Sequence, residues 1–139
     1  MKNKVLALDS NIFIYHFEAN PLFTQYTTFI FNSIVNKSNT ASTSIISLIE
    51  TLSYPSPQII LDQIEESFRT LPNFTIYNIN QEIALQTARI RRAYKFRLPD
   101  SVQLATALTT KADIFITNDL KLQSFNEIKI VQLEKVTKI

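Results

Sequence analysis

Lys4-Val5-Leu6-Ala7-Leu8-Asp9-Ser10-Asn11 is the stretch that decides how this chain folds. Its four apolar residues are followed at once by a carboxylate, a hydroxyl and an amide, side chains that favour the start of a helix. A short apolar run of this kind is typical of a buried parallel strand that leads into a helix. Ligands of open α/β sheets bind just beyond the carboxyl ends of the strands, where Asp9 would stand. An Asp in this place is also a common N-cap, so Asp9 alone does not identify a site.

The composition is that of an ordinary folded protein. The 139 residues are 45% hydrophobic and 19% charged with a net charge of +2, and this length suits one domain, residues 1–139. The sequence contains no cysteine, which excludes disulfides, and no glycine, which excludes glycine-dependent phosphate loops. Only four apolar residues lie between the basic segment 2–4 and Asp9, too few for a signal peptide, and no apolar run approaches the roughly 20 residues of a membrane span. We therefore expect a cytoplasmic protein with no membrane contact.

Apolar runs of strand length alternate with helical patterns along the whole chain. The expected strands cover residues 5–8, 40–43, 74–77, 113–117 and 128–133. The expected helices cover residues 12–17, 21–36, 45–54, 58–70, 81–94 and 99–110, and a short one ends near residue 125. This alternation predicts a single-domain three-layer α/β/α fold with a central parallel sheet of about five strands. The helix at 45–54 is apolar on most sides, so we expect it to be buried.

Four acids do not fit the pattern of solvent-exposed carboxylates. Asp9 and Asp119 each follow an apolar strand, which puts both at the carboxyl edge of the sheet. Glu50 lies in the helix that we expect to be buried, where an unpaired carboxylate would cost several kcal/mol. Asp100 begins a helix and shares a face with apolar residues one and two turns later. These acids are the candidate site.

Each acid also has a structural interpretation when it is taken singly. Asp9, Asp100 and Asp119 could cap or begin helices, and Glu50 could be an incidental surface residue. Together they would repel, because at ~5 Å each pair costs several kcal/mol even at an effective dielectric near 20. A cation relieves this repulsion, and oxygen ligands without His or Cys favour Mg²⁺ or Mn²⁺. One or two such ions can activate water and hold a phosphodiester for attack.

Polar and basic residues surround these positions. The candidates for orienting the carboxylates or a bound water are Ser10, Asn11, Thr117 and Asn118. A turn and a helix cap explain Ser10 and Asn11 equally well. The candidates for contacts with an RNA backbone are the basic residues Arg89, Arg91, Arg92, Lys95 and Arg97. A solvated helix face also explains this basic run.

The ordered set of motifs resembles the PIN domain, and in particular the VapC-type toxins of bacterial toxin–antitoxin pairs. The matching motifs are Leu8-Asp9-Ser10-Asn11, Glu50 in its helix, Leu98-Pro99-Asp100 with Ala105 and Ala107 after it, and Thr117-Asn118-Asp119. The resemblance spans residues 5–131 and implies a magnesium- or manganese-dependent endoribonuclease in which water attacks an RNA phosphodiester. It implies that the catalytic metal ligands are Asp9, Glu50, Asp100 and Asp119. A homodimer and a cognate antitoxin protein that neutralises the toxin are implied as well.

The sequence departs from the family pattern at one place. Many relatives have a further acid two residues after the last Asp, followed by an aromatic residue. Lys121 and Leu122 occupy those positions here. The number of metal ions, one or two, therefore stays open.

Other functions agree with parts of the same pattern. A catalytically silent PIN-like binding scaffold would have the same fold, and only the four acids argue against it. A flavodoxin-like phospho-acceptor signalling domain needs adjacent acids after the first strand, whereas Asp9 stands singly and Asn78 follows the third strand. Asn11 likewise opposes a phosphatase of the Asp-x-Asp kind. The sole histidine, His16, is not expected to be a catalytic base, and contact with RNA or a partner is open for it.

Overall fold

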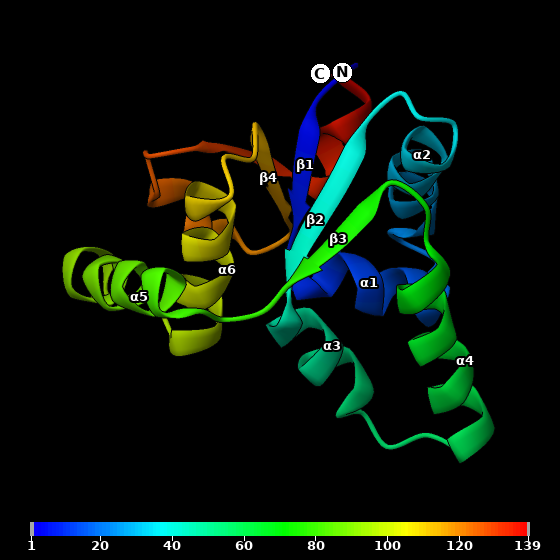
Figure 1. The fold of residues 1–139 in the computed structure, drawn as a ribbon. Coiled ribbons are helices and arrows are strands. Elements are labelled where there is room, and N and C mark those ends of the chain that lie inside the picture. Colours follow the sequence, from blue (N-terminus) through cyan, green and yellow to red (C-terminus); the bar gives the residue numbers. More distant parts are fainter. Residues whose placement is uncertain (1, 139) are drawn as a thin grey trace.

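A five-stranded, all-parallel sheet forms the centre of the structure, which is a computed structural model that describes residues 2–138 (Figure 1). Its strands are β1 (Val5–Leu8), β2 (Thr40–Ser44), β3 (Phe74–Tyr77), β4 (Ile114–Thr117) and β5 (Lys129–Gln132), in the order β3-β2-β1-β4-β5. The central strand β1 pairs with β2 on one side and with β4 on the other. The predicted parallel sheet is therefore confirmed.

The two faces of this sheet carry separate apolar cores, because successive strand residues point to opposite sides. Leu6 and Leu8 pack into one core, and Ala7 packs with Phe115 into the other. Helices α1 (Ser10–Phe17), α2 (Thr24–Val35) and α4 (Gln58–Thr70) cover the first face (Figure 1). Helices α5 (Gln81–Tyr94) and α6 (Leu98–Thr109) cover the second. The three-layer α/β/α architecture is thus confirmed.

Helix α3 (Ile45–Leu52) is not the buried helix that its composition predicts. Its buried residues are Ser47 and Thr51, whereas Ile49 is 55% exposed and Glu50 is only half-buried. The prediction was wrong because Ser47 faces α1, where its hydroxyl lies 3.2 Å from the hydroxyl of Ser10. The buried residues of α3 are thus small and polar, and its larger apolar side chains are half-buried or exposed.

Several element boundaries differ from the predicted ones by a few residues. Helix α1 begins at Ser10 because the Asp9 side chain caps it, and α2 begins at Thr24 because residues 21–23 form a turn. A short 3-10 helix, η1 (Leu120–Ser124), follows β4, and a second, η2 (Leu133–Lys138), follows β5. The second was not predicted, and its residues Leu133 and Val136 are fully buried. Within residues 2–138, no helix is long and apolar enough to cross a membrane.

Candidate active site

The carboxyl ends of β1 and β4 carry two of the four candidate acids. Asp9 follows β1 and Asp119 follows β4, and these two strands are neighbours in the sheet. Asp100 lies in the first turn of α6, and Glu50 lies in α3. Asp9 is repelled by Asp100 and Glu50, and Asp100 is repelled by Asp119 and Glu50. The four acids therefore act on one another electrostatically although they come from four separate segments.

Asp9 is the most buried of these acids, with 5% of its surface exposed. Its Oδ1 accepts a hydrogen bond from the backbone N–H of Ser10 at 2.8 Å, and its Oδ2 accepts one from the hydroxyl of Thr117 at 2.7 Å. Burial raises the pKa of Asp9 from 3.8 to about 7, repulsion by Asp100 and Glu50 adds to the rise, and the Thr117 bond opposes it. Asp9 is thus a helix cap and also a buried carboxylate that resists ionisation.

Thr117 links the ends of β1 and β4. Its hydroxyl donates to Asp9 and accepts a hydrogen bond from the backbone N–H of Asp119 at 3.0 Å. The Oδ1 of Asp119 in turn accepts a hydrogen bond from the backbone N–H of Lys121, also at 3.0 Å. Thr117 therefore holds the carboxylate of Asp9 and the backbone of Asp119.

Ser10 holds Glu50 rather than Asp9 with its side chain. The Ser10 hydroxyl donates to Oε1 of Glu50 at 2.6 Å. Because that hydroxyl has only one proton, it acts as an acceptor toward the Gln103 amide, whose Nε2 lies 3.0 Å away. Ser10 thus connects a candidate ligand on α3 to α1 and α6.

A buried polar network behind the acids was missed by the sequence analysis. The Gln103 amide donates to Ser10 and, at 2.8 Å, to Ser47. The Thr43 hydroxyl donates to the Leu8 carbonyl at 2.7 Å, so Ser47 is the donor in its 2.6 Å contact with Thr43. The available signal was spacing, because Gln103 follows Asp100 by three residues and Ser47 precedes Glu50 by three.

Asp100 opens onto a cavity of about 270 Å³. Its side chain is 16% exposed, and Oδ2 lies 3.5 Å from Nε of Arg97. Burial raises the pKa of Asp100, Arg97 opposes the rise, and Asp119 and Glu50 add to it. The residues that line the cavity are Lys95, Phe96, Arg97, Asp100, Asp119 and Lys121.

The donor chemistry of the four acids fits a hard divalent cation. All candidate ligands are carboxylate oxygens, and burial together with like-charge repulsion disfavours the ionised state of Asp9. No three acidic or histidine side chains in residues 2–138 are close enough to hold one ion as they stand. An ion held by three or more of them would therefore require a change of side-chain rotamers.

Hydrogen bonds of Asn11 and Asn118 connect the end of β4 to α1. The backbone N–H of Asn118 donates to Oδ1 of Asn11 at 3.4 Å, and its side-chain amide donates to the Tyr15 hydroxyl at 3.0 Å. These bonds connect the two asparagines to each other and to Tyr15. Their contribution to the candidate site is to hold the strand ends in place.

The basic residues of the predicted RNA-contacting run separate into different environments. Arg89 forms an ion pair with Glu127, with one N–O distance of 2.8 Å, and Arg91 lies 3.5 Å from the carbonyl oxygen of Phe96. Arg92 is exposed. Only Lys95 and Arg97 line the cavity beside Asp100.

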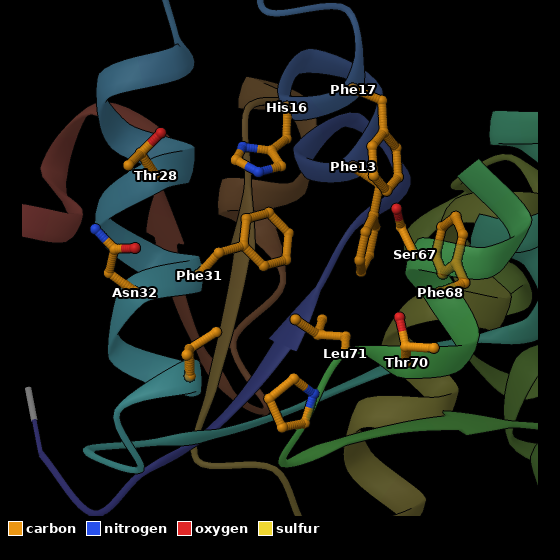
Figure 2. Close-up of a pocket in the computed structure, with 12 residues that line it drawn as sticks. Phe13, His16, Phe17, Thr28, Phe31, Asn32, Ser67, Phe68, Thr70 and Leu71 are labelled. Carbon is orange, nitrogen blue, oxygen red and sulfur yellow. The ribbon is translucent and has the colours of Figure 1, made fainter. Parts of the chain in front are cut away.

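His16 lines a different cavity, of about 400 Å³, between α1, α2 and α4. Figure 2 shows His16, Phe31 and Phe13 around the same space, with Phe68 and Leu71 contributed by α4 and the turn after it. The His16 Nδ1 lies 2.9 Å from the Thr27 hydroxyl, and burial lowers the pKa of His16. Because Asp100 and Asp119 line another cavity, His16 has no place in the candidate active site.

Comparison with solved structures finds the same fold in toxin–antitoxin complexes. VapBC2 from Rickettsia felis bound to promoter DNA aligns over 92% of this chain and 98% of its own, with a TM-score of 0.74 and 15% identity. A toxin–antitoxin complex from Klebsiella pneumoniae aligns over 93% and 97%, with a TM-score of 0.68 and 24% identity. DNA-bound VapBC from Salmonella typhimurium aligns over 94% and 98%, with a TM-score of 0.72 and 18% identity.

Comparison of sequences gives the family. No curated protein sequence is similar enough to this chain to be matched. A sequence model of the PIN domain, however, matches residues 6–128, which include all four candidate acids, all of β2, β3 and β4, and β1 except its first residue, whereas β5 follows the matched range. This match covers far more than half of the chain. The chain therefore belongs to the PIN domain family, and its fold resembles that of VapC toxins.

Proposed function

We propose that this protein is a magnesium- or manganese-dependent endoribonuclease, the toxin of a toxin–antitoxin pair. The observation that carries the proposal is the buried carboxylate of Asp9, whose neighbours Asp100 and Glu50 carry the same charge. A bound cation lowers the free-energy cost of ionising such a carboxylate. Metal-dependent phosphodiester hydrolysis needs a cation held in this way by carboxylates. Membership of the PIN domain family supports the same reaction.

The chain's own residues would hold the ion and position the substrate. The proposed ligands are Asp9, Glu50, Asp100 and Asp119, and the ion, when bound, supplies Lewis acidity and activates water. Thr117 and the Ser10 backbone fix the two oxygens of Asp9, and the Ser10 hydroxyl fixes Glu50. Lys95 and Arg97 lie beside Asp100, where they can bind phosphates of the RNA backbone.

RNA cleavage tests this function directly. Wild-type protein and Asp9→Asn are incubated with a mixture of single-stranded and structured RNAs, with millimolar Mg²⁺, with Mn²⁺, or with a chelator. The wild type is expected to cut only with a metal, and Asp9→Asn is expected to lose at least a hundredfold in rate. Equal cleavage by the two proteins would refute the assigned site. No cleavage of any RNA by the folded wild type would favour the silent binding scaffold.

An antitoxin is the protein partner that we propose. The three structural neighbours named above are toxin–antitoxin complexes or VapBC assemblies. The cavity between α1, α2 and α4 offers an apolar surface that the proposed chemistry does not use. We assign this surface to the antitoxin because it is lined by Phe17, Phe31 and Leu71 and is open to solvent at Val35, which is 54% exposed.

Co-expression tests the antitoxin proposal. The protein is produced together with the product of the open reading frame next to its gene, and the complex is isolated by size-exclusion chromatography. Val35→Glu places a charge at the edge of the apolar cavity and is expected to prevent the complex. Leu85→Glu changes a residue of similar exposure on α5 and is the matched control. A complex that survives Val35→Glu would contradict the assigned surface.

A further inference from the structure

Phe96 is an aromatic side chain in the same cavity as Asp100 and Asp119, and the proposed function gives it no role. It follows Lys95, which ends α5 in the left-handed backbone conformation with φ 65°. The Lys95 N–H donates to the Arg91 carbonyl, and the Arg91 side chain lies 3.5 Å from the Phe96 carbonyl. Two contacts with Arg91 thus fix the backbone on both sides of the turn that brings Phe96 to the cavity.

The Phe96 ring is supported from one side by other aromatic rings. It lies nearly parallel to Tyr94, with an interplanar angle of 10° and centroids 5.4 Å apart. Phe125, which is 2% exposed, packs at 60° to it with a centroid distance of 6.3 Å. Phe96 itself is only half-buried and contributes its remaining surface to the cavity. The ring is therefore held in place by packing and is still accessible.

Three cationic side chains share the cavity with this ring. All three, Lys95, Arg97 and Lys121, are exposed, and Nε of Arg97 lies 3.5 Å from Oδ2 of Asp100. Proteins that bind single-stranded nucleic acid combine cationic groups along the backbone path with aromatic rings on which bases stack. The cavity has both components directly beside two of the proposed metal ligands.

We propose that Phe96 stacks on an unpaired base of the RNA, on the nucleotide next to the phosphate held at the acids. Lys95 and Lys121 would bind the phosphates that flank this nucleotide. The proposal rests on the ribonuclease function and adds the requirement that the RNA be unpaired at that nucleotide. A base inside a helix has both faces covered by its neighbours, so its face is not available to an aromatic side chain.

Fluorescence quenching tests this stacking without depending on cleavage. The parent is Asp9→Asn, which is not expected to cleave and carries one negative charge fewer beside the cavity, and the probe is a short single-stranded RNA that carries 2-aminopurine at each position in turn. Stacking on Phe96 should quench the fluorescence at one position. Phe96→Leu keeps apolar packing against Tyr94 and Phe125 but removes the flat ring. It should abolish that quenching and weaken binding by about 5- to 150-fold, because each stacked base contributes roughly 1–3 kcal/mol.

Controls separate stacking from general effects on folding and charge. Phe96→Tyr should quench and bind like the parent, and Phe29→Leu, which changes a phenyl ring of α2 that is 42% exposed, should have no effect. In a double-stranded version of the same RNA, addition of the protein should cause no further quenching at any position. Unchanged quenching and affinity in Phe96→Leu would overturn the stacking proposal while leaving the ribonuclease function intact. If the wild type cleaves no RNA and the parent binds none, the ribonuclease function fails and the stacking proposal fails with it.

Discussion

At the scale of single residues, Asp9 serves two purposes that sequence analysis treats as alternatives. One oxygen accepts the first N–H of α1, as a helix cap does, and the other is held by Thr117. The position of Asp9 was predictable because an apolar run that stops at a carboxylate is typical of a buried strand that leads into a helix. The bond from Thr117 was not predictable, because it joins residues 108 positions apart in the sequence.

The ionisation of Asp9 gives a prediction about stability and pH. The folded protein holds the Asp9 proton up to a pKa of about 7, whereas the unfolded chain releases it near 3.8. Between these values the folded state binds more protons than the unfolded state, so the free energy of unfolding falls as the pH rises. Above pH 7 the folded state carries the full cost of an ionised, buried Asp9 carboxylate. Asp9→Asn removes this penalty. In metal-free buffer at pH 8 the variant should be more stable by about 1–3 kcal/mol, which is a rise in Tm of several degrees.

Thermal unfolding at several pH values checks this prediction. The advantage of Asp9→Asn should shrink as the pH falls toward 4, because the folded carboxyl is then protonated and the unfolded one is only partly ionised. Asp62→Asn, at an exposed position of α4, should unfold like the wild type throughout. A variant at position 9 that is less stable than the wild type at pH 8 would contradict the assigned burial and charge of Asp9.

At the scale of elements, the polar network of Gln103 joins α6 to α1 and α3. Its amide donates to Ser10 and Ser47, and through Ser10 it supports Glu50. The network was not predicted from the sequence, because α3 and α6 consist mainly of apolar residues. Such residues predict apolar packing and not hydrogen bonds. The same apolar bias made α3 look buried, although its only buried residues are Ser47 and Thr51. Composition therefore predicted that α3 is a helix but not which of its faces is covered.

Replacing Gln103 measures what this network contributes. Gln103→Met keeps a similar volume but leaves Ser10 and Ser47 without their buried donor. The free energy of unfolding should fall by about 1–3 kcal/mol, because a buried polar group without a hydrogen-bond partner is removed from water with no compensating bond. Urea denaturation provides the measurement, and Gln63→Met at an exposed position of α4 is the matched control. Equal midpoints for the two variants would show that the network is energetically neutral.

At the scale of the whole molecule, alternation of strands and helices was sufficient to predict the parallel sheet and its two covered faces. Each expected strand overlaps an observed one, because short apolar runs in an alternating α/β pattern are typical of buried parallel strands. The order β3-β2-β1-β4-β5 was not deduced from the pattern, since it depends on crossovers between distant segments. The prediction that the four acids form one site rests on the family resemblance and on the rule that ligands bind at strand ends. Their hydrogen bonds required the structure.

The homodimer remains a prediction, and the exposed apolar side chains of α3, α4 and their connection suggest where it forms. Ile49, Tyr54 and Ile59 are 55%, 58% and 66% exposed. Large apolar side chains gathered on a surface commonly mark an interface. Sedimentation velocity should therefore show a dimer for the wild type and a monomer for Ile49→Glu. A wild-type monomer, or a dimer that tolerates Ile49→Glu, would contradict this assignment.

Isothermal titration calorimetry with Mn²⁺ measures directly whether the four acids form a divalent-cation site. At pH 7 the wild type should bind Mn²⁺ and release part of a proton from Asp9, whose pKa lies at about 7, so the measured heat should depend on the ionisation enthalpy of the buffer. Asp9→Asn and Asp100→Asn should bind much more weakly, and Asp62→Asn should bind like the wild type. Absence of Mn²⁺ binding by the folded wild type, or equal binding by all four proteins, would mean that the four acids do not form a divalent-cation site.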